Sequence, residues 1–100
     1  MMGVETQTPR PDVAQRPRSS SEILPPYRVI LHNDDVNTMD HVVRSLMRCI
    51  PRIGLAKATA IMWAAHRNGK APVVTCPKEL AELYRERLQS CRLTATIEPA

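Results

Sequence analysis

The fold of this chain is decided by the polar segment His32-Asn33-Asp34-Asp35-Val36-Asn37-Thr38-Met39-Asp40-His41. A hydrophobic run, residues 27–31, precedes this segment, and an amphipathic helical pattern begins near Met39. A strand that ends in Asn-Asp-Asp and turns directly into a helix presents oxygen acceptors at a surface rim. Such a rim can hold a cation, an ammonium group or a metal ion, so the same segment also raises the question of function.

The length and composition predict one small domain that follows a tail. A chain of 100 residues leaves little room for a second domain. Residues 1–26 contain five of the nine prolines, a run of serines and almost no apolar periodicity. Such a stretch cannot bury enough surface to offset the entropy lost on ordering it. We therefore predict a disordered N-terminal tail over residues 1–26 and a folded domain over residues 27–100.

The net positive charge of the chain lies in the predicted domain. The net charge is +4, and the tail is neutral, so residues 27–100 carry 11 basic and 7 acidic side chains. This excess leaves open a small basic RNA- or ribosome-associated module. A nucleic-acid surface would require clustered basic residues and exposed aromatic rings. The aromatic residues are only Tyr27, Trp63 and Tyr84, and no long Lys/Arg run occurs, so we do not expect nucleic acid to be the main partner.

The cysteines and the hydropathy pattern predict a cytoplasmic protein. Cys49, Cys76 and Cys91 are widely spaced and form no Cys-x-x-Cys, so the sequence indicates neither a zinc knuckle nor a redox pair. They are expected to be small core residues in a reducing compartment. No apolar run is long enough to span a membrane, and the N-terminus lacks the apolar stretch of a secretory signal.

The first half of the domain predicts a strand followed by a helix. Residues 27–32 are aromatic and β-branched, as in a short strand. Asn37 or Thr38 is placed to cap the helix, with Asp40 completing a weak capping box, and Pro51 ends it. The apolar stripe with a period near 3.6 consists of Met39, Val42, Val43, Leu46, Met47 and Ile50.

A second helix and a short strand follow. The helix is predicted over residues 55–68, and Gly69 is placed to end it in the left-handed conformation. Residues 72–75 form the strand, in which Pro72 marks an edge or a strand start. The apolar face of this helix consists of Leu55, Ala58, Ile61, Met62, Ala65 and His66.

A third helix and a last strand complete the predicted domain. Thr75 or Cys76 is expected to cap the helix, with Pro77 in its first turn. Residues 93–97 alternate apolar and polar, as in a half-buried strand. The helix has an apolar stripe of Leu80, Leu83, Tyr84, Leu88 and Cys91. The order strand, helix, helix, strand, helix, strand predicts an α+β two-layer sandwich. Its helices would cover one face of a three-stranded, mainly antiparallel sheet.

The acidic segment admits several chemical interpretations. Paired carboxylates such as Asp34 and Asp35 perform acid–base catalysis when their pKa values differ, but no nucleophile is associated with them. A metal-dependent enzyme would use His32, Asp34, Asp35, Asp40 and His41, whose spacing matches no closed metal motif. A purely structural turn, stabilised by Asn and Asp side chains, is a third interpretation. The fourth is a site for a cation or ammonium group. We expect no catalytic residue, metal or cofactor.

The first two predicted helices carry four further candidates. Taken alone, His66 beside an apolar face is more often structural than functional, and Met39 and Met62 are more often core residues than ligand contacts. Trp63 lies one position away from the apolar stripe, so we expect it to be partly exposed.

Two motifs occur together in this sequence. They are Tyr27-Arg28-Val29-Ile30-Leu31-His32-Asn33-Asp34-Asp35 followed by Met39, and Ala58-Thr59-x-x-Met62-x-x-x-His66-x-x-Gly69-Lys70-Ala71. In this combination and at this spacing they resemble the ClpS family. The resemblance covers residues 25–98. It implies a bacterial, non-enzymatic adaptor that delivers substrates with N-terminal degradation signals (N-degrons) to a Clp AAA+ chaperone of the ClpA or ClpC type. The rival functions that remain are the RNA- or ribosome-associated module and the metal-dependent enzyme.

The resemblance also implies a role for individual residues. Asn33, Asp34 and His66 would hold the free α-amino group of an N-terminal Leu, Phe, Tyr or Trp. Asp35, Asn37 and Thr38 would shape the rim. Met39, Val42, Met62, Ala65 and Leu93 would line the side-chain slot, with Met39 as the gatekeeper against β-branched residues. Glu79 and Tyr84 would face the chaperone, and the tail would enter it.

Several positions depart from the family pattern. Asn37-Thr38 replaces the usual Thr-Pro before the gatekeeper, and Ala65 replaces a larger aliphatic residue. His41 replaces an aromatic residue, and Tyr84 stands where lysine is common.

Overall fold

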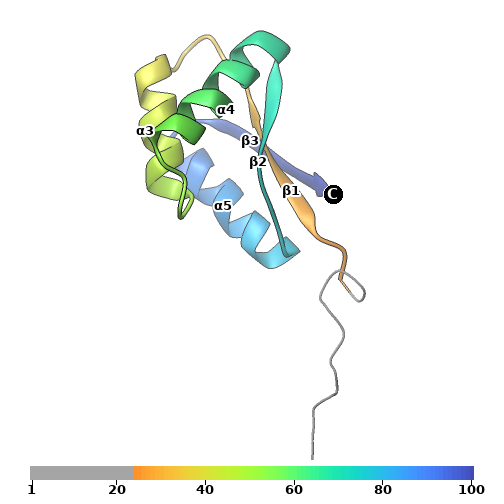
Figure 1. The fold of residues 1–100 in the computed structure, drawn as a ribbon. Helices are drawn as coiled ribbons and strands as arrows, with labels where there is room; N and C mark the ends of the chain where they lie inside the picture. The colour runs from red at the N-terminus through yellow and green to blue at the C-terminus, as the bar shows by residue number, and fades with distance from the viewer. Residues whose placement is uncertain (1–23) are drawn as a thin grey trace, which may run out of the picture.

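β1 (Tyr27–His32) is the central strand of a three-stranded antiparallel sheet in the computed structural model, which describes residues 24–100. It lies between β2 (Lys70–Cys76) and β3 (Thr94–Pro99), and the strand order is β2-β1-β3. Three helices cover one face of this sheet (Figure 1). The predicted α+β two-layer sandwich, with its order of strands and helices, is confirmed. Residues 1–23 of the predicted tail lie outside the described residues.

The register of β1 directs alternate side chains to the two faces of the sheet. Val29 and Leu31, at 0% and 2% exposure, belong to the core beneath the helices. Arg28 points to the opposite face, where it forms an ion pair at 2.9 Å with Glu98, its partner in the register with β3. The last side chain of β1 that points into the core is therefore Leu31, and the polar segment begins directly after it.

α3 (Met39–Cys49) begins directly after the polar segment. Thr38, one of the two predicted caps, accepts a hydrogen bond from the backbone N–H of His41 at 3.1 Å. This register places His41 rather than Asp40 at the third helical position, so the predicted capping box is wrong. Asp40 instead pairs with Arg44, one turn along, at 2.7 Å. Both side chains are 70% exposed, so the pair contributes little to stability.

α4 (Leu55–Asn68) has the predicted bounds and ends in the predicted way. Gly69 adopts a left-handed φ of 88°, and its N–H donates to the Ala65 carbonyl at 2.8 Å. A side chain at this φ would clash with the backbone, which is why glycine suits the position. The Gly69 carbonyl then accepts a hydrogen bond at 2.9 Å from the N–H of Asn33, just after β1. This bond joins the end of β1 to the end of α4.

α5 (Lys78–Ser90) differs from the prediction in its cap and in its buried face. β2 continues to Cys76, so Pro77 becomes the cap and neither Thr75 nor Cys76 caps the helix with its side chain. Leu80 and Leu83, which were predicted to be in the stripe, are 36% and 40% exposed. The buried residues are Tyr84 and Leu88, which were predicted to be in the stripe, and Ala81, which was not. Ala81 is fully buried, and its small side chain lets α5 pack closely on the sheet, which turns Leu80 and Leu83 toward solvent.

The core fills the space between the helices and the covered face of the sheet. Leu46 of α3, Ala58 of α4 and Leu88 of α5 are all at 0% exposure. Each of the helices found in residues 24–100 is too short or too polar to cross a lipid bilayer.

Candidate functional site

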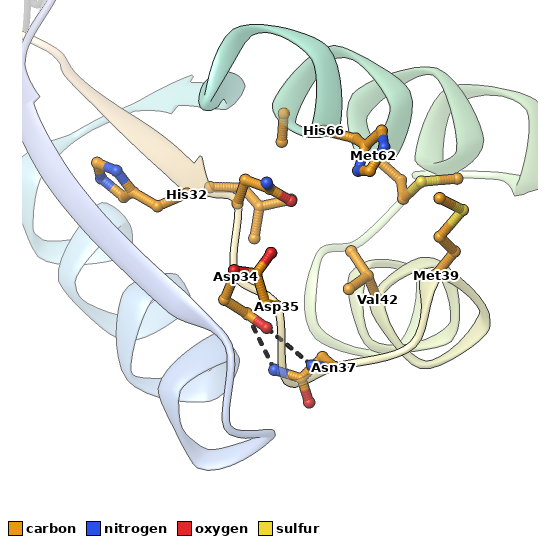
Figure 2. Close-up of a pocket in the computed structure, with 11 residues that line it drawn as sticks. His32, Asp34, Asp35, Asn37, Met39, Val42, Met62 and His66 are labelled. Atoms are coloured by element: carbon orange, nitrogen blue, oxygen red, sulfur yellow. Dashed lines mark hydrogen bonds between the residues drawn. The ribbon is translucent and has the colours of Figure 1, made fainter.

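A pocket of about 240 Å³ opens where β1 ends, between α3 and the last turn of α4 (Figure 2). It has a polar side from the segment after β1 and an apolar side from the two helices. The residues that line it are Leu31, His32, Asn33, Asp34, Asp35, Asn37, Met39, Val42, Met62, Ala65 and His66. Of the residues predicted to bind substrate, the structure brings all except Thr38 and Leu93 to this pocket.

Asp34 organises the polar side of the pocket. Its Oδ1 accepts hydrogen bonds from the backbone N–H groups of Val36, at 2.9 Å, and Asn37, at 2.8 Å. Its Oδ2 accepts a bond from Nδ2 of Asn37 at 3.1 Å. A carboxylate has about four acceptor sites, so these three bonds leave Asp34 with one acceptor site and its negative charge. The predicted Asp-stabilised turn is therefore present, and it still offers an acceptor to a ligand.

The same hydrogen bonds keep Asp34 ionised. They lower its pKa from the ordinary value of 3.8. The backbone N–H of Asn37 is the largest cause, and it outweighs the partial burial that raises the pKa. The Asn37 side chain, the Val36 N–H and the nearby His41 lower it further. A full negative charge therefore faces the pocket at neutral pH.

Asn37 links the pocket to a distant part of the chain. Its Nδ2 also donates to the carbonyl of Arg92, in the turn between α5 and β3, at 2.8 Å. Asn33 and Asp35 complete the polar side, and both are exposed. Within residues 24–100, no described hydrogen bond uses the side chain of either residue, so their oxygens are available to a ligand.

The apolar side consists of four residues from two helices. Met62 and Ala65 of α4 form its base, at 7% and 3% exposure. Val42 of α3 is half-buried beside them. Met39, in the first turn of α3, is 41% exposed, and its side chain lies near Met62 (Figure 2). Met39 is thus a flexible apolar side chain whose position can narrow the pocket.

His66 lies in the last turn of α4, next to the polar side. Its ring meets the ring of Trp63 edge-on, with centroids 5.7 Å apart and an interplanar angle of 82°. Trp63 is 39% exposed, as predicted. His66 is exposed and lines the pocket, so its imidazole is within reach of a ligand bound there.

The five residues of the metal interpretation do not come together. His32 points away from the pocket and bonds to Thr96 Oγ1 at 2.7 Å (Figure 2). His41 Nε2 bonds to the carbonyl of Cys91 at 2.8 Å, and Asp40 pairs with Arg44. Within residues 24–100, no three His, Cys, Asp or Glu side chains are grouped as metal ligands.

Four predicted residues lie elsewhere in the domain. Thr38 caps α3 and lines an adjoining groove, while Leu93, at 4% exposure, is packed in the core. Glu79 is exposed on α5. Tyr84, five positions later on that helix, is only 8% exposed because it packs into the core. Tyr84 therefore presents little surface to a partner.

Two residues that line the pocket and one contact beside it were not predicted from the sequence. Leu31 lines the pocket because it is the last inward position of β1, which the alternation of the strand could have indicated. His32 borders it beside the polar segment, although its ring points away toward Thr96. The contact between Asn37 and Arg92 spans 55 positions, and no local pattern signals it.

Comparisons with known proteins agree on one family. The family model described as "ATP-dependent Clp protease adaptor protein ClpS" matches residues 22–96. The ATP-dependent Clp protease adapter protein ClpS of Synechococcus elongatus is 44% identical over 90 residues, which cover 88% of this chain and 95% of the relative. The chloroplastic adapter CLPS1 of Arabidopsis thaliana is 41% identical over 96 residues, covering 96% of this chain and 60% of the relative.

A solved structure shares the same fold. Agrobacterium tumefaciens ClpS2 bound to L-phenylalaninamide superposes with a TM-score of 0.70 at 30% sequence identity. The match covers 76% of this chain and 98% of that protein. The sequence match, the fold and the position of the pocket-lining motifs together confirm the resemblance. The chain belongs to the ClpS family of ATP-dependent Clp protease adaptor proteins, which are adaptors and not enzymes.

Proposed function

We propose that the pocket binds the first residue of a substrate protein, through its free α-amino group and its hydrophobic side chain. The chain would then deliver that substrate, as an N-degron adaptor, to a Clp AAA+ chaperone. The ligand of the Agrobacterium protein supports this, because L-phenylalaninamide combines a free amine with an aromatic side chain. N-terminal Leu, Phe, Tyr and Trp are the residues expected to bind.

One observation carries the proposal: a single pocket has an anionic polar side directly opposite an apolar side. Asp34 supplies the charge, and Met62 and Ala65 supply a buried apolar base. An N-terminal residue has the matching arrangement, with its ammonium group and its side chain on the same carbon. An internal residue has the side chain but lacks the ammonium group, so it would leave the polar side without a partner.

Individual roles follow from this arrangement. Asn33, Asp34 and His66 would hold the ammonium group, and Asp35 and Asn37 would meet the backbone that follows it. Met39, Val42, Met62 and Ala65 would contact the side chain. Thr38 and Leu93 would act indirectly, Thr38 by capping α3 and Leu93 by supporting the turn that holds Asn37.

The expected affinity is moderate. Burial of a leucine-sized side chain contributes roughly 1.5–3 kcal/mol. Each hydrogen bond to a charged group adds about 1.5–3 kcal/mol. After the cost of association, a dissociation constant on the order of micromolar is expected. Such an affinity suits an adaptor that must release its substrate to the chaperone.

The chaperone partner would be of the ClpA or ClpC type. Glu79, exposed on α5, is the residue that we expect to contact it, and Tyr84 would support the same surface from the core. The bacterial cytoplasmic location stays a prediction, since the relatives include proteins of chloroplasts as well as of cyanobacteria.

A peptide titration tests the proposal. A peptide that begins with Leu or Phe should bind, and the same peptide with an acetylated N-terminus should not, because acetylation removes the positive charge. Equal affinity for the two peptides would contradict an ammonium site. RNA binding that weakens steeply with salt, in the absence of peptide binding, would instead support the RNA-associated alternative.

A further inference from the structure

Two cysteines that are far apart in the sequence have their sulfur atoms in contact. Cys49 is the last residue of α3, and Cys91 is the residue that caps the C-terminus of α5. Their Sγ atoms are 3.6 Å apart, although 42 positions separate them in the sequence. Both are free thiols. The sequence predicted no redox pair, because the spacing of the cysteines does not indicate this contact.

The two thiols differ in their access to solvent. Cys49 is buried at 4% exposure, whereas Cys91 is partly exposed. Cys91 also lines a surface groove of about 510 Å³, together with Thr38, His41 and Arg48. A small oxidant in solvent can therefore reach Cys91 directly and Cys49 only through it.

We propose that Cys49 and Cys91 form an oxidation site, in which hydrogen peroxide converts the two thiols into an intramolecular disulfide. The sulfurs must approach by about 1.5 Å, from 3.6 Å to a bond length of about 2.05 Å. Cys91 stands at the end of α5, next to a turn, so small side-chain and backbone rotations there supply this movement. A disulfide would tie the C-terminal ends of α3 and α5 together.

The reaction balances in two steps. The Cys91 thiolate attacks one oxygen of peroxide, the O–O bond breaks, and Cys91 becomes a sulfenic acid while hydroxide leaves and takes up a proton as water. The Cys49 sulfur then attacks Sγ of Cys91. The S–O bond breaks, and the hydroxyl group leaves as a second water with the proton of Cys49. Two thiols lose two electrons, and one peroxide gains them.

The environment assigns this order to the two cysteines. Burial is the main cause that raises the pKa of Cys49 to about 11, and its hydrogen bond with Cys91 adds to the rise. Cys49 is therefore almost entirely a thiol at neutral pH, and a buried thiol is a poor first target for peroxide. It is well placed as the resolving partner once the exposed sulfur has been oxidised.

The disulfide would restrict the turn after α5, which is hydrogen-bonded to residues at the pocket and in α3. The carbonyl of Cys91 accepts a hydrogen bond from His41, and the carbonyl of the next residue, Arg92, accepts one from Asn37. Closing the 42-position loop also restricts the unfolded chain. The oxidised domain should therefore unfold at a higher temperature than the reduced one, by several degrees.

Mass spectrometry of the peroxide-treated full chain tests this proposal without any peptide ligand, so its failure would not touch the proposed adaptor function. We expect the mass to fall by two hydrogens, reversibly with dithiothreitol, and a digest without reductant to link the peptides of Cys49 and Cys91. The unfolding midpoint should rise in the same sample. A Cys91 that proceeds to sulfinic acid with no linked peptide, or a disulfide between two chains, would overturn the proposal.

Substitutions provide the matched control. Cys76, at the end of β2, is the one remaining cysteine of the chain. Cys76→Ser should leave the linkage intact, whereas Cys91→Ser should abolish both the linkage and the rise in the unfolding midpoint. If Cys76→Ser abolishes the linkage, the pairing is wrong. Because Cys91 is partly exposed, Cys91→Ser is expected to fold, and the measurement on the unsubstituted chain stands independently of that variant.

Discussion

Asn37 donates a hydrogen bond to each carboxylate oxygen of Asp34, from its backbone N–H at 2.8 Å and from its side-chain Nδ2 at 3.1 Å. The same Nδ2 reaches the carbonyl of Arg92 at 2.8 Å. One amide group therefore fixes the anionic side of the pocket and attaches it to the turn between α5 and β3.

Asn37→Ala should weaken the binding of an N-terminal Leu or Phe peptide. The variant loses the bonds from Nδ2 but keeps the backbone bond to Asp34, so we expect a loss of about 1 kcal/mol, or roughly fivefold in the dissociation constant. Fluorescence anisotropy with a labelled peptide measures it. Val36→Ala is the control, because Val36 is 89% exposed and does not line the pocket. An equal effect of the two substitutions would argue against a specific role for the amide.

The ionisation of Asp34 should make stability depend on acid pH. The pKa of Asp34 in the folded state lies below its ordinary value of 3.8. Its contribution to stability is therefore complete above pH 3.8 and is lost as the pH falls through the lowered pKa. Asp34→Asn removes this contribution. Urea unfolding of both proteins should show a difference at pH 7 that narrows below pH 3.8, and a difference independent of pH would contradict the assignment.

Peptide binding should also weaken on the alkaline side. An N-terminal amine has a pKa of about 7.7–8.0, so a peptide loses its positive charge above that range. Asp34 stays ionised, and the loss comes from the ligand. We expect the dissociation constant to rise several-fold between neutral pH and pH values well above this range, measured by isothermal titration calorimetry. A constant affinity over this range would mean that the charge of the amine is not recognised.

Met39→Ala should admit peptides that begin with Ile or Val. Met39 is 41% exposed beside Met62 at the pocket, and shortening it leaves space for the second branch of a β-branched side chain. Met47→Ala is a matched control, since Met47 lies on the same helix at 42% exposure and outside the pocket lining. Competition with a panel of N-terminal residues measures the change. If Met39→Ala still excludes peptides that begin with Ile or Val, Met39 does not act as a gatekeeper.

His66→Ala should weaken peptide binding by at least about 1 kcal/mol, the scale of one lost hydrogen bond to a charged group. Tryptophan fluorescence can follow the binding, because Trp63 is the only tryptophan of the chain and its ring contacts that of His66. Peptide binding should alter its fluorescence in the unsubstituted protein. Asn68→Ala is the control, because Asn68 is exposed at the end of the same helix and does not line the pocket. An unaltered affinity in His66→Ala would return His66 to a structural role.

Gly69→Ala should destabilise the domain by roughly 1–2 kcal/mol, because alanine is strained at a left-handed φ of 88°. Thermal unfolding followed by circular dichroism measures the loss. Gly54 provides the comparison, with a φ of −89° that alanine adopts readily and no atom within 4 Å of an added Cβ. Gly54→Ala should therefore cost clearly less. Equal losses at the two glycines would show that the backbone conformation is not the cause.

Local patterns predicted the elements of the fold well where one signal dominated. The aromatic and β-branched residues of positions 27–32 and the glycine after residues 55–68 give the observed bounds of β1 and α4. β2 is longer than predicted because Lys70 and Ala71 pair with His32 and Leu31. That pairing depends on a strand far away in the sequence, so the segment itself does not reveal it.

The site could be predicted only from two separated motifs considered together. Asn33 and Asp34 alone were compatible with a turn, a metal site or an ammonium site, and His66 alone was compatible with a structural role. Their meeting at one pocket depends on how α4 returns to the end of β1. For the same reason, the contact between Cys49 and Cys91 was not predicted, because it depends on the packing of α5.

The hydrogen bond from Asn33 to the Gly69 carbonyl has a consequence for the electrostatics of the pocket. It holds the C-terminal end of α4 at the place where a ligand would present its positive charge. The carbonyl groups at such an end carry the equivalent of roughly half a negative charge, which no proton can neutralise. The pocket therefore combines a titratable anion with a permanent backbone dipole. Both attract a cation at neutral pH, so the dipole reinforces the attraction that Asp34 exerts on the ammonium group of a ligand.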